Sequence, residues 1–322
     1  MKARILNTIK AALVITLPMA AFGQDYHFSQ FDAMVPAYQP AKTGMFNDSK
    51  YRATTQYRNQ WRPIATKPFT TFGMSYDMPI NERWGVGGYI QNFDGARVFN
   101  AFNVVASGAY KITDPTQNKH LLTTGLQLGG VYKNINNLDL LFENQYDDGK
   151  LNPVIASNES FRRMSKLSPE VNLGVYYEWT DEVNDYHPYI GFTAFHLTSP
   201  KESILETGTS DARLPRRWLF HSGCKLDLTE EIDMDFKAMY QYQGKATELM
   251  LGFSGIYKLH EAKTDIHLGC YYRNRDAVII NTGLTYEELT FTIGYDVTVS
   301  GLKEYNGGYG ALEFGLTYRP GL

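Results

Sequence analysis

The chain has 322 residues, and its 31 Lys and Arg residues nearly balance its 34 Asp and Glu residues, giving a formal net charge of −3. A mean hydropathy of −0.35, with no long apolar run after the N-terminus, excludes a bundle of membrane-spanning helices. The charge balance excludes a generic nucleic-acid binder, and two cysteines exclude a disulfide framework. The 23 Tyr and 18 Phe residues favour strands. Tyr suits strands whose ends contact water, because its ring is apolar and its hydroxyl is polar.

The first 23 residues have the pattern of a secretory signal peptide. Lys2, Arg4 and Lys10 form a positive region, and the apolar stretch Ala11–Ala21 follows. Small residues then stand at positions −3 and −1 of a cut before Gln24. The apolar stretch is too short to span a bilayer as an anchor helix. The sequence therefore predicts an exported protein with domain boundaries at 1–23 for the signal peptide, 24–50 for an N-terminal segment and 51–322 for the main domain.

From residue 51 onward, apolar and polar residues alternate with the period of a β-strand. Every second residue between Leu289 and Val297 is apolar, with Thr, Gly and Asp between them. Such segments run for about 9 to 12 residues, against about 5 to 6 in an ordinary globular strand. Their apolar phase tends to end in an aromatic residue, as in the girdles of outer-membrane barrels: Tyr76, Trp84, Tyr110, Tyr132, Trp179, Trp218, Tyr257, Tyr272, Tyr286 and Tyr318.

Fourteen such segments are expected, and an even number places both ends of a bacterial barrel on the periplasmic side. The sequence therefore predicts an all-β fold, a 14-stranded antiparallel transmembrane β-barrel of the bacterial outer membrane. The expected strands are Tyr51–Arg58, Phe69–Met78, Trp84–Phe93, Asn100–Lys111, Lys119–Tyr132, Pro169–Trp179, His187–Leu197, Pro215–Leu228, Glu231–Gln241, Ala246–Lys258, Ala262–Tyr272, Asp276–Tyr286, Leu289–Val297 and Gly310–Tyr318.

The connectors divide by length and by charge. Short connectors should face the periplasm and long ones the exterior. The outer connectors carry basic residues, among them Arg62, Arg97 and Arg273, which can pair with lipopolysaccharide phosphates. The inner turns carry an acidic set that we hypothesise docks a basic periplasmic partner, although solvation alone would also explain it: Asp181, Glu182, Asp185, Glu230, Glu231, Glu287 and Glu288.

A barrel of this size would leave an open lumen unless something fills it. Fourteen strands tilted by about 40° give a backbone diameter of roughly 28 Å. The segment Gln24–Lys50 is too apolar for a free tail, and its prolines disfavour a helix. Lys133–Ser168 is a second candidate, since loops of that length are usually functional or disordered. We expect one or both to fold into the barrel, with the N-terminal segment inside from the periplasmic side.

Catalytic and cofactor motifs are not found. The sequence contains no GxSxG, HExxH, P-loop or paired CxxC, so no enzyme activity, cofactor or metal is predicted. A barrel hydrolase stays open as a third class of function, because His196, His221 and His267 could point into the lumen. The glycines of Gly85–Gly88 resemble a dinucleotide loop but lie inside a strand, where they indicate a crowded position.

One strand end combines the residue types that anchor protein interfaces. This run carries two aromatic rings, two guanidinium groups and two amides, and it consists of Tyr57, Arg58, Asn59, Gln60, Trp61 and Arg62. It is a candidate contact surface for a partner protein. The alternative is an interfacial girdle with loop contacts, which the sequence alone does not separate from it.

Several motifs resemble the PorP/SprF family of Bacteroidetes outer-membrane proteins. They are the opening QDYHFSQ from Gln24 followed by PAY at Pro36, YRNQW from Tyr57, and GYDVTVSGL from Gly294. The chain departs from the family at Val35, where relatives usually show Asn, and in the tail Arg319–Leu322.

The resemblance implies an accessory or anchoring barrel of a type IX secretion system. Such a barrel would support secretion or surface display of partner proteins such as adhesins, and gliding motility. Its partners would be outer-membrane lipid and lipopolysaccharide, other type IX components and a secreted surface protein, with no nucleic acid. The alternative function is a passive or gated pore for small solutes.

Overall fold

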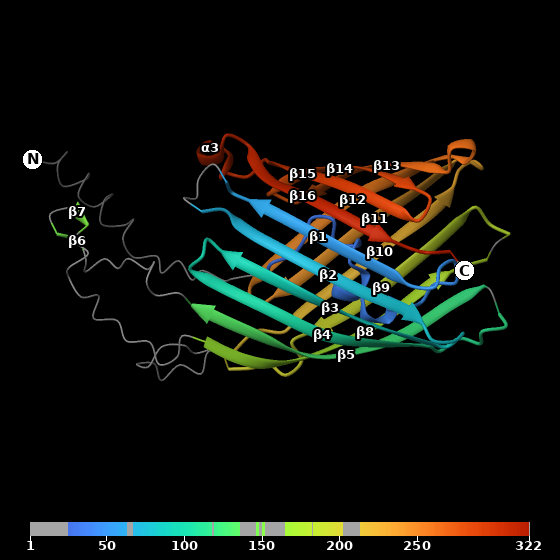
Figure 1. Cartoon of the computed structure of the whole chain (residues 1–322), viewed down its shortest axis with the longest axis horizontal. Coiled ribbons are helices and arrows are strands. Elements are labelled where there is room, and N and C mark those ends of the chain that lie inside the picture. The colour runs from blue at the N-terminus through green and yellow to red at the C-terminus, as the bar shows by residue number, and fades with distance from the viewer. Residues whose placement is uncertain are drawn as a thin grey trace, which may run out of the picture.

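A computed structural model of the chain describes residues 25–62, 67–117, 119–135, 146–147, 150–151, 165–181, 183–201 and 213–321. The expected signal peptide lies outside these residues. Within them, fourteen antiparallel strands close into one barrel (Figure 1). No helix in the described ranges is long and apolar enough to cross a bilayer.

The wall strands are β1 (Arg52–Gln60), β2 (Phe69–Pro79), β3 (Trp84–Gly95), β4 (Phe99–Lys111), β5 (His120–Ile135), β8 (Ser165–Trp179), β9 (Tyr186–Phe195), β10 (Arg217–Asp227), β11 (Ile232–Gln243), β12 (Ala246–Leu259), β13 (Thr264–Arg273), β14 (Ala277–Tyr286), β15 (Leu289–Thr298) and β16 (Tyr309–Tyr318). Two short strands, β6 (Tyr146–Asp147) and β7 (Lys150–Leu151), pair with each other. The helical turns are α2 (Val35–Tyr38), η1 (Pro40–Lys42), η4 (His260–Ala262) and α3 (Lys303–Asn306).

Each wall strand pairs with its neighbours in chain order, and β1 closes the ring by pairing with β16. The predicted all-β, 14-stranded barrel is confirmed, and each expected segment overlaps one strand. The ends differ by a few residues. The largest difference is at β8, which begins at Ser165 although Pro169 suggested a later start. Pro169 lies opposite Gly130, and the pairing with β5 continues past it as far as Ser165 and Asn134.

The two faces of the wall have opposite chemistry. On β15 and β16, Phe291 and Leu316 are 43% and 40% exposed on the outer face. The alternate positions Asp296 and Glu313 are buried at 1% and 0% on the inner face. The apolar phase therefore meets lipid and the polar phase faces the lumen, as the alternation predicts.

The two ends of the barrel also differ. The connectors β2–β3, β4–β5, β8–β9, β10–β11, β12–β13 and β14–β15 meet at one end, named the short-turn end, together with both termini of the wall. The longer connectors and α3 meet at the opposite end, named the loop end (Figure 1). In outer-membrane barrels short turns face the periplasm and long loops face the exterior.

The segment from Asp25 to Ser49, named the lumen segment, runs lengthwise inside the barrel. The Asp25 N–H donates to Gln243 Oε1 at the loop end. At the short-turn end, the following Lys50 N–H donates to Pro320 O. Between these points Met34 and Tyr38 are 1% and 7% exposed. Its apolar side chains are thus removed from water by the barrel wall, which explains why so apolar a segment can precede the first strand.

Glycines in the wall let the lumen segment approach the strands closely. A Cβ at Gly125 would lie 2.3 Å from the Pro40 carbonyl carbon, and one at Gly85 would lie 2.1 Å from Thr43 O. The crowded strand position expected at Gly85 is therefore observed. Gly44 has a φ of +63°, a left-handed conformation that suits glycine.

The lipid face predicts the effect of a charge at mid-strand. Ile293 lies on the outer face between Thr282 and Phe314. Ile293→Arg should destabilise the assembled barrel by about 2–4 kcal/mol, because a guanidinium near the bilayer midplane is poorly solvated. The fraction of barrel that shifts on unboiled electrophoresis and its urea midpoint measure this.

The matched control is Thr292→Arg, one residue away on the inner face. Its cross-strand partners are Gly283 and Gly315, which leave lateral room for a longer side chain. This variant should assemble better than Ile293→Arg. Equal losses in the two variants would contradict the register.

Candidate functional site

A cluster of buried charges binds the lumen segment to β1, β13, β15 and β16. Glu313 accepts from the backbone N–H groups of Ser29 at 2.6 Å and Gln30 at 2.9 Å, and it pairs with the Arg58 guanidinium. Asp296 pairs with Arg58 at 3.0 Å and with Arg273 at 2.7 Å. We name these four charged residues the Asp296–Glu313 cluster. The two guanidinium groups neutralise the two carboxylates, so burial of the cluster leaves no isolated charge.

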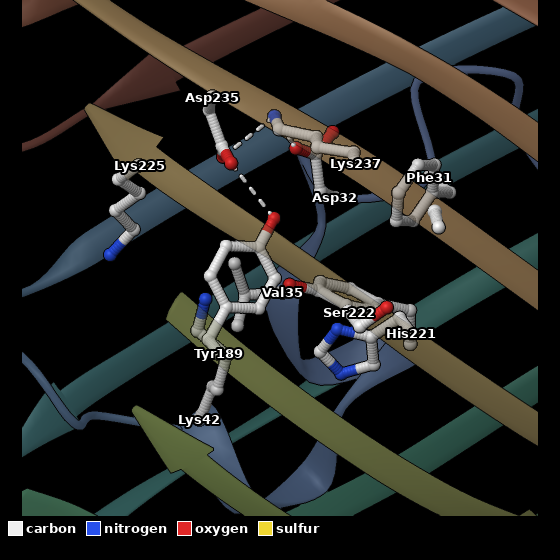
Figure 2. A pocket seen from close by; sticks show the side chains of 12 residues that line it. Phe31, Asp32, Val35, Lys42, Tyr189, His221, Ser222, Lys225, Asp235 and Lys237 are labelled. Atoms are coloured by element: carbon white, nitrogen blue, oxygen red, sulfur yellow. Dashed lines mark hydrogen bonds and ion pairs between the residues drawn. The ribbon is translucent and has the colours of Figure 1, made fainter. Parts of the chain in front are cut away.

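A second set of ionic contacts lies at the middle of the lumen segment. Lys237 of β11 pairs with Asp32 of the lumen segment and with Asp235 at 3.4 Å. Tyr189 of β9 donates to Asp235 at 3.0 Å. These groups line a small cavity of about 80 Å³ together with Lys42. Figure 2 shows Asp235 joined by dashed lines to Lys237 and to the Tyr189 hydroxyl. The charges of Asp32 and Lys237 are thus satisfied by each other across the boundary between lumen segment and wall.

The helical turn α2 is held by hydrogen bonds from the wall to its backbone. Gln127 Nε2 donates to Pro36 O at 2.6 Å, and Thr193 Oγ1 donates to Tyr38 O at 3.0 Å. Gln39 Nε2 donates to His221 Nε2 at 3.0 Å, so that imidazole nitrogen is an acceptor. The wall supplies partners for backbone carbonyls that a four-residue helix leaves unpaired.

The first described residues of the lumen segment are fixed near the loop end by histidine–carboxylate contacts. His196 lies between two carboxylates, with Nδ1 2.8 Å from Glu170 Oε2 and Nε2 bonded to Asp25 Oδ2. Both ring nitrogens thus lie against carboxylate oxygens, an arrangement that favours the imidazolium form. His27 Nε2 lies 3.1 Å from Glu248 Oε2.

Above these contacts lies a cavity of about 670 Å³, named the loop-end chamber. Asp25, Tyr26, His27 and Ala37 of the lumen segment line it from below. The wall residues that line it are Arg58, Gln60, Trp61, Phe69, Tyr89, Gln91, Phe93, Phe99, Asn103, Val131, Lys133, Glu170, Phe195, His196, Leu214, Arg217, Glu248, Arg273 and Asp276. Aromatic groups come mainly from β1 to β4 and charged groups mainly from β8 to β13. Cavities with apolar walls and a few polar groups are the usual form of a ligand site.

The predicted partner-contact run divides between the two faces of β1. Tyr57 is 39% exposed on the outer face, where Asn59 donates to its hydroxyl. Arg58 is 4% exposed and Gln60 accepts from its Nε, so both face the lumen. The next residue, Trp61, has a φ of 60° and packs against Phe69, and Arg62 is exposed. The structure therefore does not bring the six residues to one surface, and three of them line the loop-end chamber.

The acidic residues predicted for the inner rim do gather at the short-turn end. Asp185, Glu230, Glu231, Glu287 and Glu288 are exposed there, and Asp181 lies 3.3 Å from Lys119. Glu182 lies outside the described residues. The Gly321 N–H donates to Glu288 Oε1 at 3.0 Å and holds the pKa of that carboxyl below its ordinary value. We name this set the acidic rim.

Sequence reasoning missed the charges that matter most inside the barrel. Arg273, predicted from the sequence to lie in an outer connector, is 5% exposed and points into the lumen. It is the last residue of β13 and lies on the lumen-facing side of that strand. Arg217 was not singled out, and Asp296 and Glu313 were read only as parts of an alternation. The available signal was the presence of opposite charges on the inner phase of separate strands. Most of Lys133–Ser168, the second predicted filler, lies outside the described residues.

The geometry defines a class: a 14-stranded outer-membrane β-barrel with a segment of its own chain bound along the lumen. A model of the family described as "Type IX secretion system membrane protein PorP/SprF" matches residues 20–318. The chain belongs to this PorP/SprF family. A search of curated proteins finds no match.

Solved structures share the barrel but little sequence. The CymD monoaromatic hydrocarbon channel matches with a TM-score of 0.56 and 10% identity, over 94% of this chain and 96% of that one. The Ralstonia pickettii toluene transporter TbuX matches with a TM-score of 0.53 and 9% identity, over 94% and 96%. At these identities the likeness establishes the fold alone.

The Asp296–Glu313 cluster predicts a stability effect. Glu313→Gln removes one of two carboxylates that neutralise Arg58 and weakens two hydrogen bonds to the lumen segment. We expect a loss of about 3–5 kcal/mol, because breaking one partner of a buried pair leaves a charge uncompensated. A lower urea midpoint and faster protease cleavage near Ser29 would measure it. The control is Glu304→Gln on exposed α3, and equal behaviour of the two variants would contradict the cluster's role.

Proposed function

We propose that this barrel is an accessory or anchoring component of a type IX secretion system, and that it supports secretion or surface display of partner proteins such as adhesins. Membership of the PorP/SprF family carries the proposal. The bound lumen segment supports it, because a barrel filled along its length by its own chain is suited to holding a protein rather than passing solutes. A contribution to gliding motility is part of the same proposal.

The two ends of the barrel suggest a division of contacts. We assign the acidic rim to a basic periplasmic component, since complementary potentials steer and orient association. At the loop end, exposed basic groups such as Arg62 and Arg97 would meet lipopolysaccharide phosphates. Tyr57, Asn59, Trp61 and Arg62 remain candidates for contact with the displayed protein.

Surface display tests the function directly. In a strain that lacks this gene, we expect proteins normally exposed on the cell to be lost from the surface proteome, measured by protease shaving of intact cells and mass spectrometry. The wild-type gene should restore them. A variant with Asp185, Glu230, Glu231, Glu287 and Glu288 changed to Asn or Gln should assemble but restore them less, with weaker co-purification of a periplasmic component. An unchanged surface proteome in the deletion strain would contradict the proposal.

Conductance tests the alternative function, a pore for small solutes. The wild-type barrel should show little stable conductance in a planar bilayer, because the lumen segment and its ion pairs occupy the lumen. Deletion of 25–46 removes Ser29, Asp32 and the α2 contacts and should raise both single-channel conductance and antibiotic uptake. Assembly of the deletion variant is checked by unboiled electrophoresis. A wild-type barrel that conducts like a porin would favour the pore.

A further inference from the structure

One guanidinium in the loop-end chamber differs from the others in its bonding. Among the described residues, Arg58 and Arg273 each donate hydrogen bonds to several side chains of the Asp296–Glu313 cluster and Ser29. Arg217, at the start of β10, has its Nε buried without a hydrogen-bond partner among the described residues. Its guanidinium stacks over the Phe195 ring at 4.0 Å and lies 3.7 Å from Asp25 through Nε.

This arrangement leaves Arg217 ready to bind an anion. The side chain is 13% exposed and lines the loop-end chamber, so its guanidinium lies beside the space that a ligand would fill. Stacking on Phe195 fixes the plane of the guanidinium, whose paired N–H groups match the two oxygens of a carboxylate. Asp25 does not satisfy it, because Asp25 Oδ2 is bonded to His196 Nε2 and is beyond hydrogen-bond distance from Arg217.

Other residues that line the same chamber also carry buried polar atoms without a partner. These atoms are Tyr26 Oη, Asn103 Oδ1 and Glu248 Oε1. Glu248 uses its second oxygen, Oε2, for His27. Each of these atoms is closed to water, so none of them would contact a ligand in the chamber directly.

The aromatic side of the chamber offers apolar surface beside these groups. Tyr26 stacks on Phe93 with ring centroids 4.6 Å apart, and Phe93 lies 6.2 Å from Phe69 and 6.3 Å from Phe99. Trp61 extends this row by packing against Phe69 at 5.0 Å. The row comes from the lumen segment and from strands or strand ends of β1 to β4, so it is fixed by the wall.

We propose that the loop-end chamber binds a carboxylate attached to an apolar body. Arg217 would hold the carboxylate, and the aromatic row would cover the apolar part. The volume of about 670 Å³ suits a ligand of two or more apolar side chains. A free peptide C-terminus has this chemistry, and so does a small acylated amino acid. The site does not depend on the secretion role, because it is defined by the barrel alone.

The test uses the assembled full-length barrel in lipid nanodiscs and calorimetric titration. The first probe is N-acetyl-Phe-Phe with a free carboxylate, and the second is the same dipeptide as its C-terminal amide. We expect the acid to bind about ten-fold to one hundred-fold more tightly than the amide, since a charge-assisted bond to Arg217 is lost in the amide. This comparison needs no variant of the protein.

Variants then assign the preference to its residues. Arg217→Gln should abolish the preference for the acid over the amide, and Arg217→Lys should keep only part of it. The control is Arg216→Gln, whose guanidinium is exposed beside Leu197 O and should leave binding unchanged.

Chain length separates the two sources of such a ligand. Tighter binding of N-acetylated tetrapeptides than of N-acetyl-Phe supports a peptide C-terminus, and the reverse order supports a small acylated amino acid. Equal affinity for acid and amide on the unmodified barrel would overturn the inference. A preference for the acid that persists in an assembled Arg217→Gln variant would also overturn it. Neither result bears on surface display, which is measured separately in cells.

Discussion

The lumen of this barrel depends on buried polar groups of the wall whose hydrogen bonds and ion pairs are completed by the lumen segment. Glu313 is fully buried and accepts from two backbone N–H groups of that segment, while Lys237 pairs with Asp32 on it. An empty lumen would expose these groups to water, but it would also expose Met34, Phe28 and Tyr38. Ionic contacts thus determine where the segment sits, and apolar burial supplies most of the gain in free energy. The segment and the wall are therefore complementary both in charge and in apolar surface.

The fold was predictable because a membrane barrel imposes one simple rule on its sequence. Lipid outside and polar contacts inside require alternation on every strand, so Leu289–Val297 and its counterparts reveal the wall directly. The end of β8 was less predictable, since Pro169 resembles a strand boundary and the pairing that carries the strand to Ser165 comes from β5, far away in sequence. Apolar composition also indicated that residues 24–50 need burial. Composition alone could not show that Asp25 would lie near the loop end and Lys50 at the other.

The site was less predictable than the fold because alternation gives the face of a residue but not its partners. The run at Tyr57–Arg62 was notable for its residue types, yet the same alternation sends Arg58 into the lumen and Tyr57 to the outer face. Arg273 illustrates the same limit, since its carboxylate partner Asp296 lies two strands away on β15. The position of the acidic rim was easier to predict. The hairpin turns that carry these residues all lie at the short-turn end of the barrel, so their acidic side chains lie there together. What those charges bind depends on another molecule and is not encoded in the barrel geometry.

The two ends of the barrel are built for different kinds of contact. At the short-turn end, Glu230, Glu231 and Glu287 are exposed carboxylates on tight turns, a charged surface that gains little from burying apolar area. At the loop end, aromatic rings and the guanidinium of Arg217, whose Nε lacks a hydrogen-bond partner among the described residues, line the loop-end chamber. The lumen segment forms one side of this chamber. Because Asp25 touches His196 and lies near Arg217, a ligand in that chamber would contact the lumen segment as well as the wall. Binding at the loop end would then favour the filled state of the lumen, since the complete chamber exists only while the segment is bound.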